Sequence, residues 1–170
     1  IPSGVTILGL KYRESGYDTS FAGSFNSNDP FFNSLWTKAV RTIYVNMRDN
    51  YSDCPTRERA LWWGDAAVDI RGSFYAFDSK ANALTNKGIR ELVGWRNTNG
   101  VLHSPVPGNT RELPPQMLNS ISEFWNFYIQ SGDSSALDGT TYNAIKTYMN
   151  LWTFDGQGLV NHRPGDWDWH

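Results

Sequence analysis

The chain has 170 residues, of which 39% are hydrophobic and 19% are charged, and its formal net charge is −2. This length suffices for one domain with a substantial core, and the lack of a basic run argues against nucleic acid or an anionic membrane as a partner. No apolar run approaches the roughly 20 residues that span a bilayer, and the single cysteine, Cys54, rules out an internal disulfide. Aromatic residues are abundant, at 15% with eight tryptophans, and we assign most of them to a helical core.

The spacing of apolar residues predicts a helical body behind a short extended lead-in. Residues 5–13 form a β-rich apolar run, and residues 14–28 are rich in Gly, Ser and Asn, as in a loop. Asp29 and Pro30 then suit the cap and the first position of a helix. Five amphipathic helices are expected, over residues 30–50, 62–77, 80–95, 114–130 and 140–154. Helix follows helix without an intervening strand, which excludes a βαβ sheet and favours a ring or bundle of helical hairpins.

The segment DCPTRERALWWGD, residues 53–65, places three acids, two arginines and two tryptophans in one short window. If residues 58–69 are helical, acids and an indole share one face of that helix. The residues on this face would be Glu58, Trp62, Asp65 and Asp69. Asp53 precedes a proline, so we place it on the loop that leads into the helix. Carboxyl groups handle protons in glycoside hydrolysis and indole faces cover the apolar side of a pyranose, so the segment indicates carbohydrate chemistry.

Purely structural explanations of these acids are also open. Acids near a helix N-terminus are favoured by the helix dipole in any protein. A proton donor needs a raised pKa, which neighbouring carboxylates favour and neighbouring cations oppose. Glu58 has neighbours of both kinds, so the sequence does not decide the direction of its pKa shift.

The segment GDWDW, residues 165–169, repeats the combination of acid and indole. It either binds sugar, with Trp167 as a substrate contact, or packs its tryptophans over the helices.

No other motif indicates a different chemistry. The three histidines, His103, His162 and His170, lack the spacing of metal ligands. We therefore expect no metal and no other cofactor. Cys54 beside Pro55 is interpreted as a small buried residue rather than as a catalytic thiol.

Two stretches of the chain resemble the α-L-rhamnosidases of glycoside hydrolase family 78. They are FAGSFNSNDPFFNSLW, residues 21–36, and DCPTRERALWWGDA, residues 53–66. In that family the catalytic domain is an (α/α)6 barrel of helical hairpins that follows β-sandwich domains. The resemblance therefore implies that residues 1–27 are a lead-in or linker from a β domain, and that residues 28–170 are the N-terminal part of the barrel.

The resemblance also implies a role for each residue of the acidic segment. Glu58 would be the general acid that protonates the departing glycosidic oxygen. Asp53 and Asp65 would bind rhamnose hydroxyls, and Trp62 would line the sugar site. Arg57 would contact the substrate or support the residues that do.

The family inverts configuration, and its general base is a Glu from the later half of the barrel. We therefore expect the base to lie outside this chain, both ends of which look cut. The isolated chain should be inactive and should leave an apolar edge uncovered. Its expected partners are a rhamnose-containing glycan or glycoside and the remainder of its own catalytic domain.

Three alternatives stay open at this point. The same fold could act on another deoxy or uronic sugar. A non-catalytic helical domain could bind glycans through exposed Trp and Asp. In a purely structural scaffold, Asp53, Glu58 and Asp65 would not converge. The sequence does not fix the compartment, although a periplasmic or secreted location is the favoured expectation.

Overall fold

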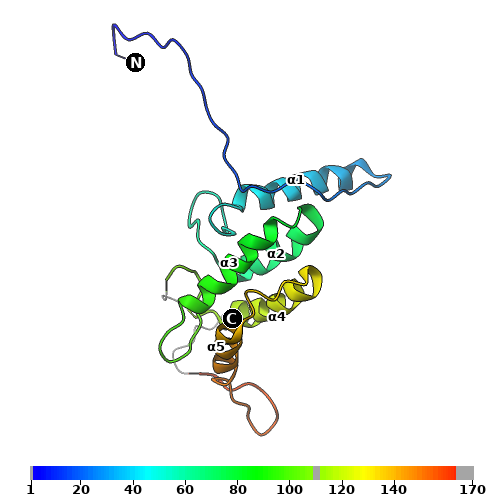
Figure 1. Cartoon of the computed structure of the whole chain (residues 1–170), viewed down its shortest axis with the longest axis vertical. Helices are drawn as coiled ribbons and strands as arrows, with labels where there is room; N and C mark the ends of the chain where they lie inside the picture. Colours follow the sequence, from blue (N-terminus) through cyan, green and yellow to red (C-terminus); the bar gives the residue numbers. More distant parts are fainter. Residues whose placement is uncertain (1, 109–111, 164–170) are drawn as a thin grey trace.

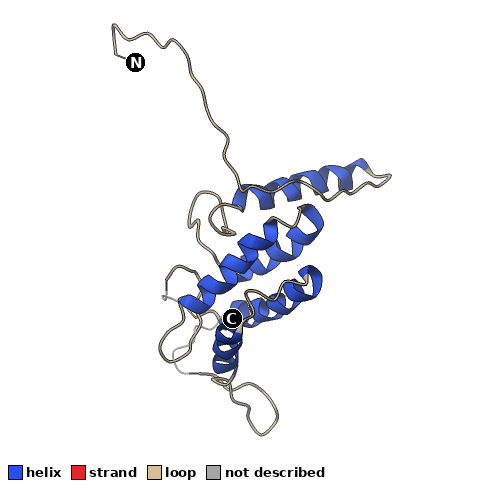
Figure 2. Cartoon of the chain, in the orientation of Figure 1, coloured by secondary structure: helices blue, strands red, loops and turns tan. Residues whose placement is uncertain are grey.

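The computed structural model describes residues 2–108 and 112–163 (Figure 1). Within these residues the chain forms five α-helices and no β-strand, and isolated bridges are the only strand-like pairing (Figure 2). The helices are α1 (Pro30–Asn46), α2 (Trp63–Ala76), α3 (Ala81–Gly94), α4 (Pro114–Ser131) and α5 (Gly139–Met149). The predicted all-helical fold is therefore confirmed. Trp167 and the segment around it lie outside the described residues.

The lead-in runs as an extended trace away from the helices, as Figure 1 shows. Residues 5–13 form no strand and most of their apolar side chains are exposed. Nearer the body the lead-in is fastened to the end of α2. The Gly23 amide donates to the Ala76 carbonyl oxygen at 3.0 Å, and the Thr19 hydroxyl donates to Asp78 Oδ1 at 2.8 Å.

The first and last helices are shorter than predicted. Helix α1 begins as expected, with Asp29 Oδ1 accepting from the Phe31 amide at 2.8 Å. It ends at Asn46 rather than near residue 50, because Met47 turns to an extended conformation and pairs with Tyr51. Helix α5 ends at Met149, and the residues after it form a turn closed by a bridge between Phe154 and Val160.

The core lies between α2 and α4, the two helices that pack most extensively against each other. Trp63 of α2 is fully buried and meets the Phe124 ring edge-on, with ring centroids 5.1 Å apart. Arg71 of α2 forms an ion pair with Glu123 of α4, whose side chain is fully buried. Helix α1 packs on α2, and α3 packs on α5. The start of α2 is therefore held by the best-packed part of the domain.

Part of the apolar surface has no cover in the described structure. Phe32 and Leu35 of α1 are exposed, and so is Trp125 of α4. A groove of ≈ 350 Å³ runs between α4 and α5. Its apolar lining includes Ile121, Trp125, Tyr128, Leu137, Tyr142 and Ile145. None of the described helices combines the length and the apolar character needed to cross a membrane.

Candidate active site

The acidic segment folds as a closed loop and not as the start of α2. The helical face considered for residues 58–69 does not form, because α2 begins only at Trp63, one residue after its predicted start. Arg59 adopts a left-handed backbone conformation, with φ of 51°, which a continuing right-handed helix does not allow. Asp53 closes the loop through two bonds to Ala60. The Asp53 amide donates to the Ala60 carbonyl oxygen, and the Ala60 amide donates to Asp53 Oδ1, both at 3.0 Å.

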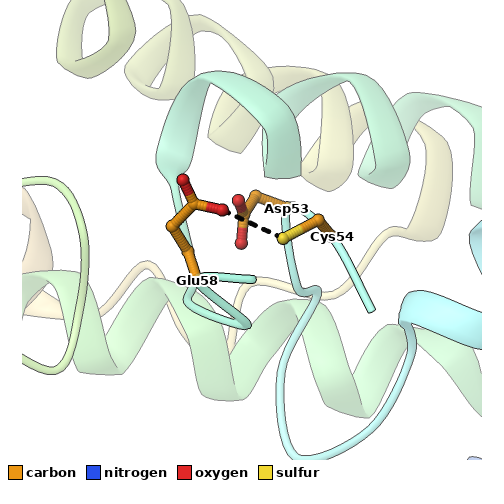
Figure 3. A group of neighbouring side chains, drawn as sticks. All are labelled: Asp53, Cys54 and Glu58. Atoms are coloured by element: carbon orange, nitrogen blue, oxygen red, sulfur yellow. Dashed lines mark hydrogen bonds between the residues drawn. The ribbon is translucent and has the colours of Figure 1, made fainter. Parts of the chain in front are cut away.

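This loop brings the predicted acids together by a route that helical spacing did not foresee. Figure 3 shows Glu58 folded back over Asp53 and Cys54. One ligand atom from each of these three side chains lies within 4.8 Å of the others. Asp65 stands in the first turn of α2, where partial burial raises its pKa and the charges of Asp53 and Glu58 add to the effect. Asp53 and Glu58 therefore converge and the charges of both act on Asp65, which a purely structural scaffold would not require.

Cys54 contributes a hydrogen bond to this group. Its thiol donates to Glu58 Oε2 at 3.1 Å (Figure 3). We expected Cys54 to be a small buried residue, but it is half-buried within the loop. This group offers oxygen and sulfur atoms that could ligate a cation, one from each of Asp53, Cys54 and Glu58. The expectation that no metal is needed here stays a prediction.

Arg57 sets the ionisation of Glu58 in this conformation. Its guanidinium contacts both carboxylate oxygens, with Nε 2.6 Å from Oε2 and Nη2 2.6 Å from Oε1. These bonds, with help from the Cys54 thiol, lower the pKa of Glu58 to about 2. Glu58 is therefore a carboxylate at neutral pH. The Arg57 side chain is 84% exposed and that of Glu58 is 31% exposed, so the pair sits at the surface.

The pKa values of Asp65 and Asp69 are raised, in contrast to that of Glu58. Desolvation raises the pKa of Asp65, and Asp53 adds to the effect. One turn along α2, burial raises the pKa of Asp69 from 3.8 to about 7, and the charge of Asp65 adds to it. Asp69 was predicted to lie on the acidic face, but it was given no role. The structure makes it the described carboxyl group nearest to holding a proton at neutral pH.

Trp62 is the residue that immediately precedes α2. Its backbone is extended and its side chain is half-buried. In the described part of the chain the buried indole Nε1–H has no acceptor. The position of Trp62 between the loop and Asp65 is compatible with the predicted wall of a sugar site, a role that stays a prediction.

Two residues that the sequence did not single out hold the start of α2. Ser104 Oγ accepts from the Trp63 amide at 2.9 Å, and Gln116 Oε1 accepts from the Gly64 amide at 3.2 Å. Leu61, just before the helix, pairs with Val106 in an isolated bridge. These partners come from the loop after α3 and from α4. No local pattern in the sequence could have identified them.

Known proteins are similar to this chain in sequence and in fold. Residues 20–169 match the family described as the bacterial alpha-L-rhamnosidase 6 hairpin glycosidase domain. An alpha-L-rhamnosidase of Formosa agariphila is 26% identical over 173 residues, which cover 88% of this chain and 17% of that protein.

The crystal structure of a GH78 family rhamnosidase of Bacillus sp. GL1 has the same fold, with a TM-score of 0.78 and 22% sequence identity. The match covers 88% of this chain and 16% of that one. The chain thus spans about a sixth of the length of either relative. Its helices correspond to part of a six-hairpin fold. Since the family match takes in nearly the whole sequence, the chain belongs to the bacterial α-L-rhamnosidase six-hairpin glycosidase family.

Proposed function

We propose that this chain is the N-terminal part of the catalytic domain of an inverting glycoside hydrolase that removes terminal α-L-rhamnose. The observation that carries the proposal is the cluster of Asp53, Cys54 and Glu58 just before α2, in which the charges of Asp53 and Glu58 also act on Asp65 in the first turn of the helix. Family membership supplies the reaction class, and the loop geometry supplies a place where a sugar can meet several carboxyl groups at once.

Glu58 is the proposed general acid, and it must hold a proton when the glycosidic bond breaks. With Arg57 in contact it does not, because its pKa is about 2. Arg57 is mostly exposed and exposed ion pairs are held weakly, so a bound sugar can displace it. Loss of the cation, exclusion of water and the nearby charge of Asp53 would then all raise the pKa of Glu58. In this proposal, the ion pair with Arg57 holds Glu58 ionised until a sugar binds.

Asp53 and Asp65 are the proposed partners of sugar hydroxyls. One oxygen of Asp53 is engaged by the Ala60 amide, which fixes the orientation of the side chain. The other oxygen is available to accept from a hydroxyl. Asp65 stands in the first turn of α2 and reaches the surface, although partial burial and the charge of Asp53 raise its pKa. Trp62 lies between these two acids in the chain and would cover an apolar face of the sugar. Trp167 is proposed as a further contact.

The general base is proposed to lie outside this chain, in the remainder of the catalytic domain. Inversion requires a water between acid and base, whose carboxyl groups are then about 6.5–9.5 Å apart. The apolar groove between α4 and α5 is a surface on which further helices of that domain can pack. On this proposal residues 28–170 belong to the barrel, and residues 1–27 connect it to a β domain. Its substrate is a rhamnose-containing glycan or glycoside.

Replacing Glu58 by Gln in the full-length protein tests the proposal. With an aryl α-L-rhamnoside as substrate, kcat should fall by about 10²–10⁴, the usual contribution of a general acid, while KM changes little. Glu14→Gln, which alters an exposed carboxylate paired with Arg41, is the matched control and should leave kcat unchanged. NMR of the first-formed sugar should show the inverted anomer. An unchanged kcat in the Glu58 variant, or a retained anomer, would contradict the proposal.

One observation favours a second candidate, a non-catalytic rhamnose-binding domain. An ionised Glu58 held by Arg57 is well suited to accept hydrogen bonds from hydroxyls without donating a proton. The full-length protein would then bind L-rhamnose in calorimetry but release no product from the aryl rhamnoside. Product release by the wild type excludes this candidate.

A further inference from the structure

Helix α2 has no cap of its own at the end that faces the candidate site. The residue before it is Trp62, which has no side-chain oxygen to accept a bond from the first amides. These amides have no partner inside the helix, and a cap from Ser, Thr, Asp or Asn is the usual solution. Both Asp29 of α1 and Asp138 of α5 provide such caps from their own sequence. Helix α2 must find its acceptors elsewhere.

Ser104 and Gln116 supply them from distant parts of the chain. Ser104 Oγ accepts from the Trp63 amide and donates its proton to Gln116 Oε1 at 2.9 Å. The same Gln116 oxygen accepts from the Gly64 amide at 3.2 Å. Ser104 is fully buried, so bulk water does not replace it in this arrangement. The two side chains therefore act as one cap, with Gln116 as its outer member.

Gly64 provides the room for this cap. A Cβ atom at position 64 would lie 2.8 Å from two side-chain carbons of Gln116, which is closer than such atoms approach. Any side chain at position 64 would push Gln116 away from the amide. The backbone of Gly64 has no left-handed conformation that would itself demand glycine. Close approach of Gln116 is thus the reason that the structure offers for glycine here.

The capped turn also sets where two proposed substrate contacts lie. Trp62 is directly before it and Asp65 is directly after Gly64. A neutral amide as the outer cap matters for charge, because a carboxylate at position 116 would add another negative charge beside Asp65. The pKa of Asp65 is already raised by burial and by Asp53. Gln116 satisfies the amides without increasing that repulsion.

We propose that Gln116 is a positioning residue of the active site, which acts through Ser104 and the first turn of α2 to orient Trp62 and Asp65. The expected change in KM rests on the proposed function, whereas the expected change in amide hydrogen exchange does not. Sugar contacts that are made equally in the ground state and in the transition state change KM and not kcat. The expected signature is therefore a change in KM, unlike that of Glu58.

The kinetic test uses the full-length protein with the variants Gln116→Ala, Gly64→Ala and the double variant. Each single change should raise KM for the aryl rhamnoside about tenfold, the effect expected of one lost cap, with kcat within about threefold of wild type. The double variant should also show about tenfold and not about a hundredfold, because both changes remove the same contact. Gln130→Ala, on an exposed turn of the same helix, is the matched control. Additive effects, or a fall in kcat alone, would overturn the proposal.

Amide hydrogen exchange gives a readout that does not depend on activity. The Gly64 amide should exchange about tenfold faster in Gln116→Ala than in wild type, and an unchanged rate overturns the proposal. Ser104→Ala, which removes one hydroxyl, provides a second variant if Gln116→Ala does not fold. It should accelerate exchange at Trp63. A wild type that lacks hydrolysis would refute the proposed function, and exchange would then decide this inference alone.

Discussion

Replacing Asp69 by Asn should stabilise the protein above neutral pH and leave its stability unchanged in acid. Burial raises the pKa of Asp69 from 3.8 to about 7 in the folded protein, and Asp65 adds to the shift. Between these two pH values the folded state keeps a proton that the unfolded chain has released. The free energy of unfolding therefore decreases as pH rises from about 4 to about 7. Asparagine carries no titrating proton, so the variant lacks this loss.

The size of the effect follows from the shift. A change of roughly 3 pKa units corresponds to about 4 kcal/mol at 1.36 kcal/mol per unit. Asp69 is half-buried rather than fully enclosed, and water screens part of its charge. We therefore expect about 2 kcal/mol in favour of Asp69→Asn at pH 8, and a difference near zero at pH 4.

Urea denaturation of both proteins across pH 4 to 8, followed by tryptophan fluorescence, measures this difference. Asp49→Asn is the matched control, because the Asp49 side chain is 94% exposed beside Lys87. It should show no comparable dependence on pH. A difference for Asp69→Asn that is the same at every pH, or a loss of stability at pH 8, would refute the desolvation argument.

Two further substitutions probe the ion pairs. Arg57→Gln should let the pKa of Glu58 rise from about 2 toward its ordinary value, and the alkaline limb of the kcat/KM profile should therefore move to higher pH. Arg59→Gln is the control, and an alkaline limb that does not move in Arg57→Gln would contradict the role of Arg57. Glu123 is fully buried while Arg71 is 59% exposed, so removing either partner should have unequal effects. Arg71→Met should lower the free energy of unfolding by about 3–5 kcal/mol because it leaves a buried charge unpaired, and Glu123→Gln should lower it by only about 1–3 kcal/mol. Equal losses of stability in urea denaturation would show that the Glu123 carboxylate is not desolvated.

The helices could be predicted because they depend on local spacing. Apolar residues at helical intervals gave the ranges of α2, α3 and α4 to within one or two residues, and Asp29 was correctly expected to cap α1. The ends of α1 and α5 were placed too late, because the apolar spacing continues past the residue at which the backbone leaves the helix. After α1, Met47 turns to an extended conformation and pairs with Tyr51, which helical periodicity does not report.

The sequence named the residues of the candidate site but did not predict their geometry. Asp53 and Glu58 do come together, yet through a loop turned by the left-handed Arg59 and closed by Asp53, not along a helix. In the sequence Glu58 has both cations and acids as neighbours, and in the structure Arg57 pairs with Glu58 and lowers its pKa. A loop's backbone conformation and an exposed ion pair both depend on small free energies, which residue patterns do not resolve.

The cap on α2 also makes the site depend on the order of synthesis. Gly64 leaves the ribosome 52 residues ahead of Gln116, a delay of roughly 3 to 10 seconds at ordinary elongation rates. During that interval the Gly64 amide lacks its acceptor, and Arg71 lacks its buried partner on α4 until Glu123 follows. The acidic loop can close as it emerges, because its hydrogen bonds join residues within 53–60, but the first turn of α2 waits for its cap. In the nascent protein the acidic segment is made early, and the first turn of α2 gains its complete cap only when α4 arrives.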